Sequence, residues 1–165
     1  MQRLELSTQA DGVLESAAKA LLAGGVAIFP TDTVYGIGAL PQYSAALEQI
    51  YKLKDRPLGM PLPLLISDIA QVRTISSFES ESLHLLAKAF WPGPLTLVLP
   101  DASKPSNSFV AQDGTIAVRS PDHAFIQSLC KLVGPIAATS ANLHGEPTPL
   151  QISGMPKAFE AVDLM

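Results

Sequence analysis

The chain reads Pro135-Ile136-Ala137-Ala138-Thr139-Ser140-Ala141-Asn142, an apolar run followed by small polar residues. A short apolar run bounded by turn residues predicts a buried strand at residues 135–139. The polar side chains of Ser140 and Asn142 then follow the end of a strand, which is where α/β folds bind ligands. Ordinary turn residues give the same pattern. These two residues therefore become informative only beside other polar segments.

Helical and strand-like segments alternate along the rest of the chain. Helical spacing of apolar residues predicts helices at 12–23, 44–54, 80–90 and 122–133, with Ser44, Ser80 and Asp122 as N-caps, and a short helix capped at Ser67-Asp68. Strands are expected at 26–29, 33–40, 62–66, 95–99 and 115–118. The polar stretch 101–108 is expected to be a mobile loop. No repeat or linker interrupts the series, which predicts one α/β domain over residues 1–165.

Composition excludes several classes of protein. Hydrophobic residues make up 47% of the 165-residue chain and charged residues 16%, which excludes a disordered chain. Acidic residues outnumber basic ones by 15 to 11, so the broad basic surface of a non-specific nucleic-acid binder is not expected. The single cysteine, Cys130, is predicted to be buried and structural. No signal peptide or membrane span is recognisable, which predicts a cytoplasmic protein that makes no membrane contact.

The segment Lys54-Asp55-Arg56 carries two cations at the end of a predicted helix. Cations commonly decorate this end because they interact favourably with the helix dipole. They are also suited to a polyanion, with Lys54 as a mobile point charge and Arg56 as a planar fork. Together with the hydrogen-bonding groups of Ser140 and Asn142, they indicate a nucleoside triphosphate site. No Walker loop or G-x-G-x-x-G motif occurs, so this site is neither a P-loop nor a Rossmann pocket.

Two further segments place polar groups at strand ends. Arg119 follows the predicted strand 115–118, and its guanidinium is expected to pair with either an internal aspartate or a ligand carboxylate. The segment 30–36 brings hydroxyls, one carboxylate and a phenol to the end of strand 26–29. Gly36 and Gly38 leave room for close approach of a ligand or another backbone. The three histidines show no metal-ligand spacing, and no metal site is predicted.

Five motifs occur in an order and at spacings that resemble the YrdC/YciO family. They are Pro30-Thr31-Asp32-Thr33-Val34-Tyr35-Gly36-Ile37-Gly38, Lys54-Asp55-Arg56-Pro57 followed by Pro61-Leu62, Trp91-Pro92-Gly93-Pro94-Leu95-Thr96, Val118-Arg119-Ser120-Pro121, and Ser140-Ala141-Asn142 with Gly145. The resemblance extends from about residue 11 to residue 165. One such motif is weak, whereas five in sequence are specific.

The resemblance implies an L-threonylcarbamoyladenylate synthase, a nucleotidyltransferase that joins L-threonine, bicarbonate and ATP and releases pyrophosphate. It implies that Lys54, Arg56, Ser140 and Asn142 bind the ATP phosphates, with Lys54 and Arg56 catalytic and Mg²⁺ bound with ATP. Arg119 matches the arginine at the threonine carboxylate, and Thr33 and Tyr35 line the same cavity. The implied fold is a twisted mixed sheet with flanking helices around a large cavity. The implied partners are tRNA or double-stranded RNA and the tRNA threonylcarbamoyl-transferase machinery downstream.

Two departures from the family pattern keep alternatives open. Many members carry a histidine in the strand after Lys-x-Arg, where this chain has residues 62–67 without one. Relatives also continue past the position of Met165 into a glycine-rich turn and a Ser-Thr-Val strand, so the chain is expected to be a shortened form. One alternative is a non-catalytic module of the same fold that binds RNA or a nucleotide. Another is a carbamoyl- or acyl-transfer enzyme acting on a different substrate.

Overall fold

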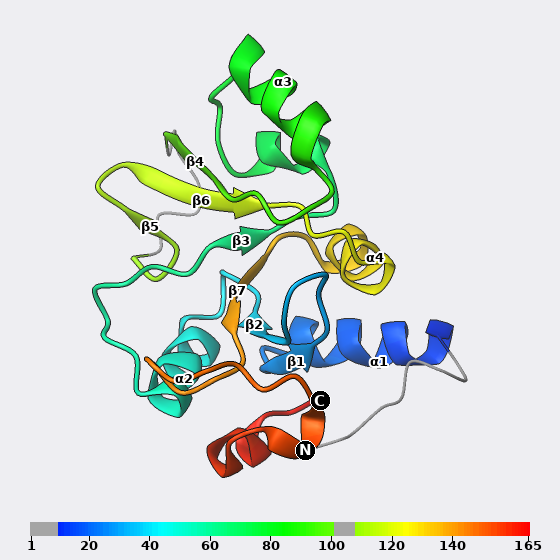
Figure 1. Ribbon diagram of the computed structural model, residues 1–165, viewed down its shortest axis with the longest axis vertical. Coiled ribbons are helices and arrows are strands. Elements are labelled where there is room, and N and C mark those ends of the chain that lie inside the picture. The colour runs from blue at the N-terminus through cyan, green and yellow to red at the C-terminus, as the bar shows by residue number, and fades with distance from the viewer. Residues whose placement is uncertain (1–9, 101–107) are drawn as a thin grey trace.

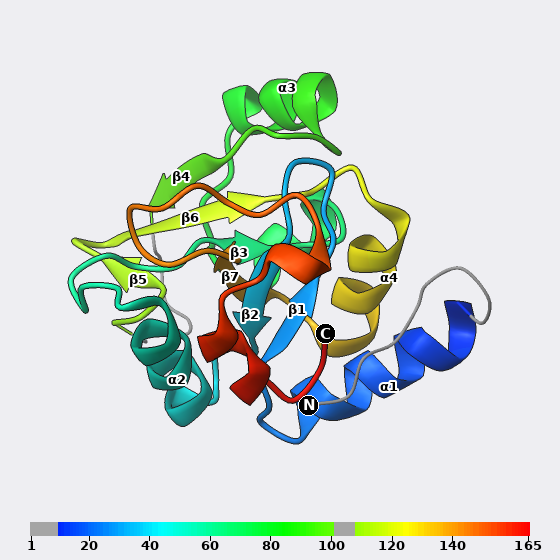
Figure 2. The same cartoon turned by 60° about the horizontal axis from the view of Figure 1, so that its bottom comes forward.

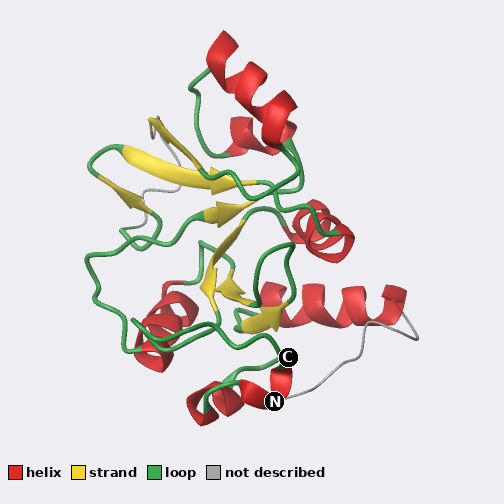
Figure 3. Ribbon diagram, viewed as in Figure 1, coloured by secondary structure: helices red, strands yellow, loops and turns green. Residues whose placement is uncertain are grey.

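The structure, a computed structural model, describes residues 10–100 and 108–165. Helices flank a single sheet (Figure 3). The helices are α1 (Ala10–Leu22), α2 (Ser44–Lys54), α3 (Glu81–Phe90) and α4 (Ala124–Val133), with 3-10 helices η1 (Ile69–Thr74), η2 (Ile152–Gly154) and η3 (Lys157–Ala161). The strands are β1 (Ala27–Phe29), β2 (Gly36–Ala39), β3 (Leu64–Leu65), β4 (Leu97–Pro100), β5 (Ala111–Gln112), β6 (Thr115–Arg119) and β7 (Ile136–Ser140). The predicted mobile loop falls, except for Ser108, outside the described residues.

The seven strands form one mixed sheet in the order β1-β2-β7-β3-β6-β4, with β5 also pairing with β6 (Figure 1). Only the pair β3–β6 is parallel, and the other pairs of named strands are antiparallel. The register sets Gly36, at the start of β2, opposite Ser140, at the end of β7. It also sets Leu65 of β3 beside Arg119 of β6. The predicted α/β class with a mixed sheet and flanking helices is confirmed.

Helices cover both faces of the sheet because side chains of its central strands alternate between the faces. On β7, Ile136 and Ala138 pack with α1 and α4, while Ala137 packs on the other side with α2. The buried face of α2 is built from Ala46, Leu47, Ile50 and Tyr51. Cys130 is fully buried among α1 and α4 side chains, as predicted, and burial raises the pKa of its thiol to about 12.

The last residues of the chain return to the first strand (Figure 2). Ala27 and Leu164 form a parallel bridge, and the Ile28 amide donates to the Leu164 carbonyl at 2.9 Å. The Val26 amide donates to the Asp163 carboxylate at 2.8 Å. These contacts extend the sheet beyond β1 with backbone from the C-terminal segment. Neither this bridge nor η2, η3 and the two-residue strand β5 is predictable from the sequence, because such short elements carry no periodic pattern.

Helix starts were predicted with mixed success. Ser80 caps α3, since its hydroxyl accepts from the Leu83 amide at 3.1 Å, and Asp68 caps η1 in the same way. The predicted caps Ser44 and Asp122 are wrong. Tyr43 and His123 occupy those N-cap positions, and neither side chain makes a capping hydrogen bond. Packing of their buried side chains stabilises both helices instead, so a polar N-cap residue is not required.

Each of the two glycines of β2 has a close neighbour that leaves no room for a side chain. A Cβ atom on Gly36 would lie 2.8 Å from the ring of Phe29, and one on Gly38 would lie 2.8 Å from the Ala137 carbonyl oxygen. A heavy atom at that distance would force the neighbouring strand or ring to move. The expected close approach of another backbone is found at Gly38, where it is made by β7, whereas the close neighbour of Gly36 is the side chain of Phe29.

Candidate functional site

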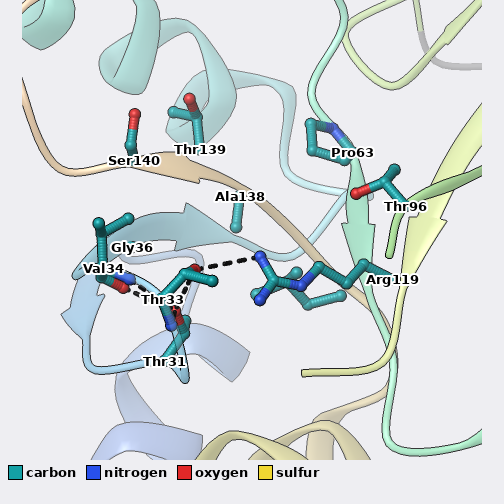
Figure 4. A pocket seen from close by; sticks show the side chains of 11 residues that line it. Thr31, Thr33, Val34, Gly36, Pro63, Thr96, Arg119, Ala138, Thr139 and Ser140 are labelled. Carbon is teal, nitrogen blue, oxygen red and sulfur yellow. Dashed lines mark hydrogen bonds between the residues drawn. The ribbon is translucent and has the colours of Figure 1, made fainter. Parts of the chain in front are cut away.

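A pocket of about 170 Å³ opens across the ends of four strands (Figure 4). Its lining residues are Thr31, Thr33, Val34, Gly36, Pro63, Leu65, Thr96, Arg119, Ala138, Thr139 and Ser140. The pocket thus combines one guanidinium and several hydroxyls with small apolar side chains. Such a lining suits a small ligand that carries an anionic group, a hydroxyl and a little apolar surface.

Arg119 is anchored at this pocket by a hydrogen bond from each of its three nitrogens. Nε donates to the Gly93 carbonyl at 3.0 Å, and Nη1 donates to the Thr33 hydroxyl at 3.2 Å. Nη2 donates to the Asp32 carboxylate at 2.6 Å, and the side chains of Arg119 and Asp32 are only 15% and 13% exposed. A guanidinium has five N–H donors. Among residues 10–100 and 108–165, the other two N–H groups have no acceptor, so they can donate to a ligand carboxylate.

The sequence left open whether Arg119 pairs with an internal aspartate or with a ligand. The structure supplies the internal partner, Asp32, and still places Arg119 in the lining. Asp32 was not singled out as a functional residue by sequence reasoning. Its signal was its position between Thr31 and Thr33, in a segment that follows a buried strand. Thr96 was also missed as a site residue, although it belongs to the motif 91–96, because it was expected to lie inside the strand 95–99.

The turn that presents Thr33 is organised by the hydroxyl of Thr31. That hydroxyl donates to the Val34 carbonyl at 2.6 Å and accepts from the backbone amides of Thr33 and Val34 at 3.2 and 3.3 Å. It also lies 3.2 Å from the Thr33 hydroxyl, in a pair where either atom can donate. Side-chain bonds of this kind are typical of threonine in turns. They fix Thr33 where it meets Arg119.

Lys54 is buried, with 1% of its surface exposed, and is not the mobile point charge predicted from the sequence. Its Nζ donates to the carbonyl of Ser140 at 2.5 Å and to the carbonyl of Asn142, and it lies 3.4 Å from the Asn142 Oδ1. The reason is tertiary: the last turn of α2 packs against the loop that follows β7. Burial, assisted by the nearby charge of Arg56, lowers the pKa of Lys54 from 10.5 to about 8.

Ser140 and Asn142 are joined to Lys54 in one network. The Ser140 hydroxyl donates to the Asn142 Oδ1 at 2.5 Å. The amide nitrogen of Asn142 donates to the carbonyls of Leu143 and Glu146 at 2.8 and 2.6 Å. Asn142 therefore holds the loop after β7 in shape while Lys54 ties it to α2. Of these three residues, Ser140 alone lines the pocket.

Arg56 and Tyr35 lie apart from the Arg119 pocket. Arg56 donates to the carbonyls of Met60 and Pro61 at 3.1 and 3.3 Å, and its guanidinium carbon sits 5.8 Å from the centre of the Tyr51 ring. Tyr35 lines a neighbouring pocket of about 230 Å³, which shares Thr31, Thr33 and Val34 with the first. That second pocket is completed by Pro30, Pro149 and Leu150.

The predicted site residues thus fall into groups. Thr33, Arg119 and Ser140 share one pocket, and Lys54 and Asn142 are bonded behind Ser140. The charge of Arg56 helps to lower the pKa of Lys54, but the Arg56 guanidinium donates a hydrogen bond to the carbonyl of Met60. Within residues 10–100 and 108–165, no three metal-ligating side chains gather into a cluster. In the same residues, no helix has the length and apolar character needed to cross a membrane.

The fold and pocket define an α/β protein with a small-ligand site at the ends of its central strands. Comparison with known proteins identifies its relatives. The profile of the Sua5/YciO/YrdC family, described as telomere recombination, matches residues 19–165. The chain belongs to this family, as the five motifs predicted.

Individual relatives agree with this assignment. Threonylcarbamoyl-AMP synthase of Bacillus subtilis is 44% identical over 149 residues, which cover 88% of this chain and 42% of that protein. A solved structure of a Pyrococcus abyssi Sua5 variant superposes with a TM-score of 0.90 at 32% identity, covering 99% of this chain and 51% of the other. Sua5 of the same organism complexed with L-threonine gives a TM-score of 0.79 at 37% identity, covering 89% and 43%. The chain therefore spans about half the length of these relatives or less.

Proposed function

We propose that this chain is a threonylcarbamoyl-AMP synthase, which makes threonylcarbamoyl-adenylate from L-threonine, bicarbonate and ATP and releases pyrophosphate. The observation that carries the proposal is Arg119, which is held at the pocket by Asp32, Thr33 and Gly93 and has two N–H groups without an acceptor in the described part of the chain. Support comes from relatives with this name and from a homologous Sua5 complexed with L-threonine.

The pocket offers a complement for the carboxylate, the hydroxyl and the methyl group of threonine. Its carboxylate pairs with the guanidinium of Arg119, and its hydroxyl meets the threonine hydroxyls of the lining. Its methyl group lies against apolar side chains such as Leu65 and Ala138. A pocket contact of one methyl group is worth only about 1–3 kcal/mol, so selection of threonine over serine is modest.

The proposed reaction has two bond-forming steps. Threonine binds with its ammonium group, which first releases one proton to solvent; the neutral amine then attacks the carbon of bicarbonate and water leaves, which gives a carbamate. A carbamate oxygen then attacks the α-phosphorus of ATP, and pyrophosphate leaves with the electrons of the broken P–O bond. Catalysis of such a displacement rests on positioning and on stabilising the charge of the leaving group.

The ATP phosphates are assigned to Lys54, Arg56, Ser140 and Asn142. ATP enters as its Mg²⁺ complex, since Mg²⁺ is usually bound through substrate phosphates and few protein ligands. Asp32, the carboxylate beside the pocket, is committed to Arg119 and is a poor candidate for a metal ligand. The side chains of Lys54 and Arg56 donate hydrogen bonds to backbone carbonyls. Phosphate oxygens carry a negative charge and are stronger acceptors, so ATP can replace these carbonyls as the partner.

The test is pyrophosphate release from this chain with ATP, Mg²⁺ and bicarbonate, with and without L-threonine. Release that requires both threonine and bicarbonate supports the synthase. Absence of release from protein that circular dichroism shows to be folded contradicts it. In the wider scheme the product supplies the threonylcarbamoyl group to tRNA through a separate transferase machinery.

One observation favours the alternative of a binding module without turnover. Lys54 and Arg56, the cations that would stabilise the leaving pyrophosphate, donate to backbone carbonyls, and in this arrangement they do not provide that stabilisation. Calorimetric binding of ATP without threonine-dependent pyrophosphate release would identify that module. Binding of double-stranded RNA with a steep salt dependence would instead indicate many phosphate contacts.

A further inference from the structure

The Arg119 pocket has an unusual balance of charge. Of its eleven lining residues, Arg119 alone carries a charged side chain. Asp32 does not line the pocket, but its carboxylate lies 2.6 Å from Nη2 of Arg119. Both side chains are mostly buried. The pair is therefore formally neutral, although the pocket wall presents only its positive member (Figure 4).

We propose that Asp32 is the residue that makes this pocket select an amino acid, with its ammonium group, over a carboxylic acid that lacks one. A ligand with no net charge enters without burying an unbalanced charge. A simple carboxylate would bring a second negative charge close to Asp32, and like charges in a shielded site disfavour each other. This inference rests on the proposed function, which places an amino acid in the pocket.

Asp32 acts through Arg119 and is therefore a positioning residue. Asp32, Thr33 and Gly93 each restrain a different nitrogen of the guanidinium, so its orientation is fixed before a ligand arrives. Preorganisation of this kind lowers the cost of binding. Lys54 is not among the lining residues, and its ammonium donates to the carbonyls of Ser140 and Asn142, so Arg119 is the cation that Asp32 pairs with.

The test compares two ligands that differ by one group. Calorimetry at neutral pH measures the dissociation constants of L-threonine and of (R)-3-hydroxybutanoate, which keeps the carboxylate, hydroxyl and methyl group and lacks the amine. The ratio of the two constants is the readout. Asp32→Asn keeps an oxygen that accepts from Nη2 and removes the negative charge. We expect the preference for threonine over 3-hydroxybutanoate to fall at least tenfold in this variant.

Matched variants separate selectivity from folding. Asp113 lies in the turn before β6, at the end of that strand away from Arg119, and has a left-handed backbone conformation (φ 52°) that asparagine tolerates. Asp113→Asn removes one negative charge there, and we expect it to keep the wild-type ratio of the two dissociation constants. Asp32→Glu retains the charge and keeps most of the preference. Asp32→Ser removes the charge with a smaller side chain and lowers the ratio as asparagine does, which covers the case in which Asp32→Asn fails to fold.

The outcomes are distinct. If Asp32 had a merely structural role, its neutral variants would bind both ligands more weakly by the same factor. An unchanged ratio of the two dissociation constants would therefore overturn the inference and leave the amino-acid site in place. Failure of the wild-type chain to bind L-threonine would overturn the proposed function, and the inference with it. A lower ratio in both neutral variants, with the wild-type ratio in Asp113→Asn, supports the inference.

Discussion

The buried ammonium of Lys54 makes the stability of the protein depend on pH in a defined window. In the unfolded chain this lysine keeps its proton up to about 10.5, whereas burial lowers its pKa to about 8 in the folded protein. Between these two values the unfolded state binds one more proton than the folded state, so raising the pH favours folding. Each pH unit contributes about 1.4 kcal/mol, or roughly 3 kcal/mol over the window.

The variant Lys54→Met removes the titrating group and keeps a long side chain. We expect the free energy of unfolding of the wild type, minus that of Lys54→Met, to be constant below pH 8 and to rise by about 2–3 kcal/mol between pH 8 and pH 10. Urea unfolding followed by circular dichroism at pH 7, 8, 9 and 10 measures this difference. Subtracting the variant cancels the titration of all other groups.

Lys52→Met is the matched control, because it removes an exposed ammonium from the same helix. A difference that stays level or falls from pH 8 to pH 10 would refute the reasoning. It would mean that the hydrogen bonds from Nζ to the Ser140 and Asn142 carbonyls stabilise the charged form as much as burial penalises it.

Further expectations concern stability, activity and reactivity. Asn142→Ala leaves the Leu143 and Glu146 carbonyls without their side-chain donor and lowers stability by about 2–3 kcal/mol; an unchanged melting temperature in calorimetry contradicts this. Lys54→Ala costs about 2–4 kcal/mol of transition-state stabilisation in threonine-dependent pyrophosphate release, and unaltered release removes Lys54 from the phosphate site. Ser80→Ala loses the α3 cap and about 1 kcal/mol in urea unfolding, with the wild-type midpoint as the refuting result. Cys130, fully buried with its thiol pKa raised to about 12, resists iodoacetamide at pH 8 until urea is added; labelling of the native protein shows that the core opens.

Much of the fold was predictable because its signals are local. The helical spacing of apolar residues located α1 to α4, and short apolar runs located most of the strands. The caps of α2 and α4 were not predictable, because packing rather than a polar cap holds those helix starts. The pairing of β2 with β7 joins segments about one hundred residues apart, and no local pattern encodes such a partnership.

The candidate site, like the fold, could be predicted from the sequence only in part. The motifs located Thr33, Arg119 and Ser140, and the structure places these three around one pocket. The motifs did not indicate that Asp32 would neutralise Arg119, because the two residues lie 87 positions apart. A contact of that kind exists only once the sheet has formed, because β7 and β3 lie between β6 and the strands β1 and β2 that flank the 31–35 turn.

By itself, the sequence determined the type of each major element, the family and the residue types available for chemistry. These properties depend on side-chain order along the chain. Only the tertiary structure decided the state of the charged groups: it buried Lys54 against carbonyls 86 and 88 residues away and paired Arg119 with Asp32. The physical reason is that the free energy of a charge depends on its surroundings, and for these groups the surroundings come from distant parts of the chain.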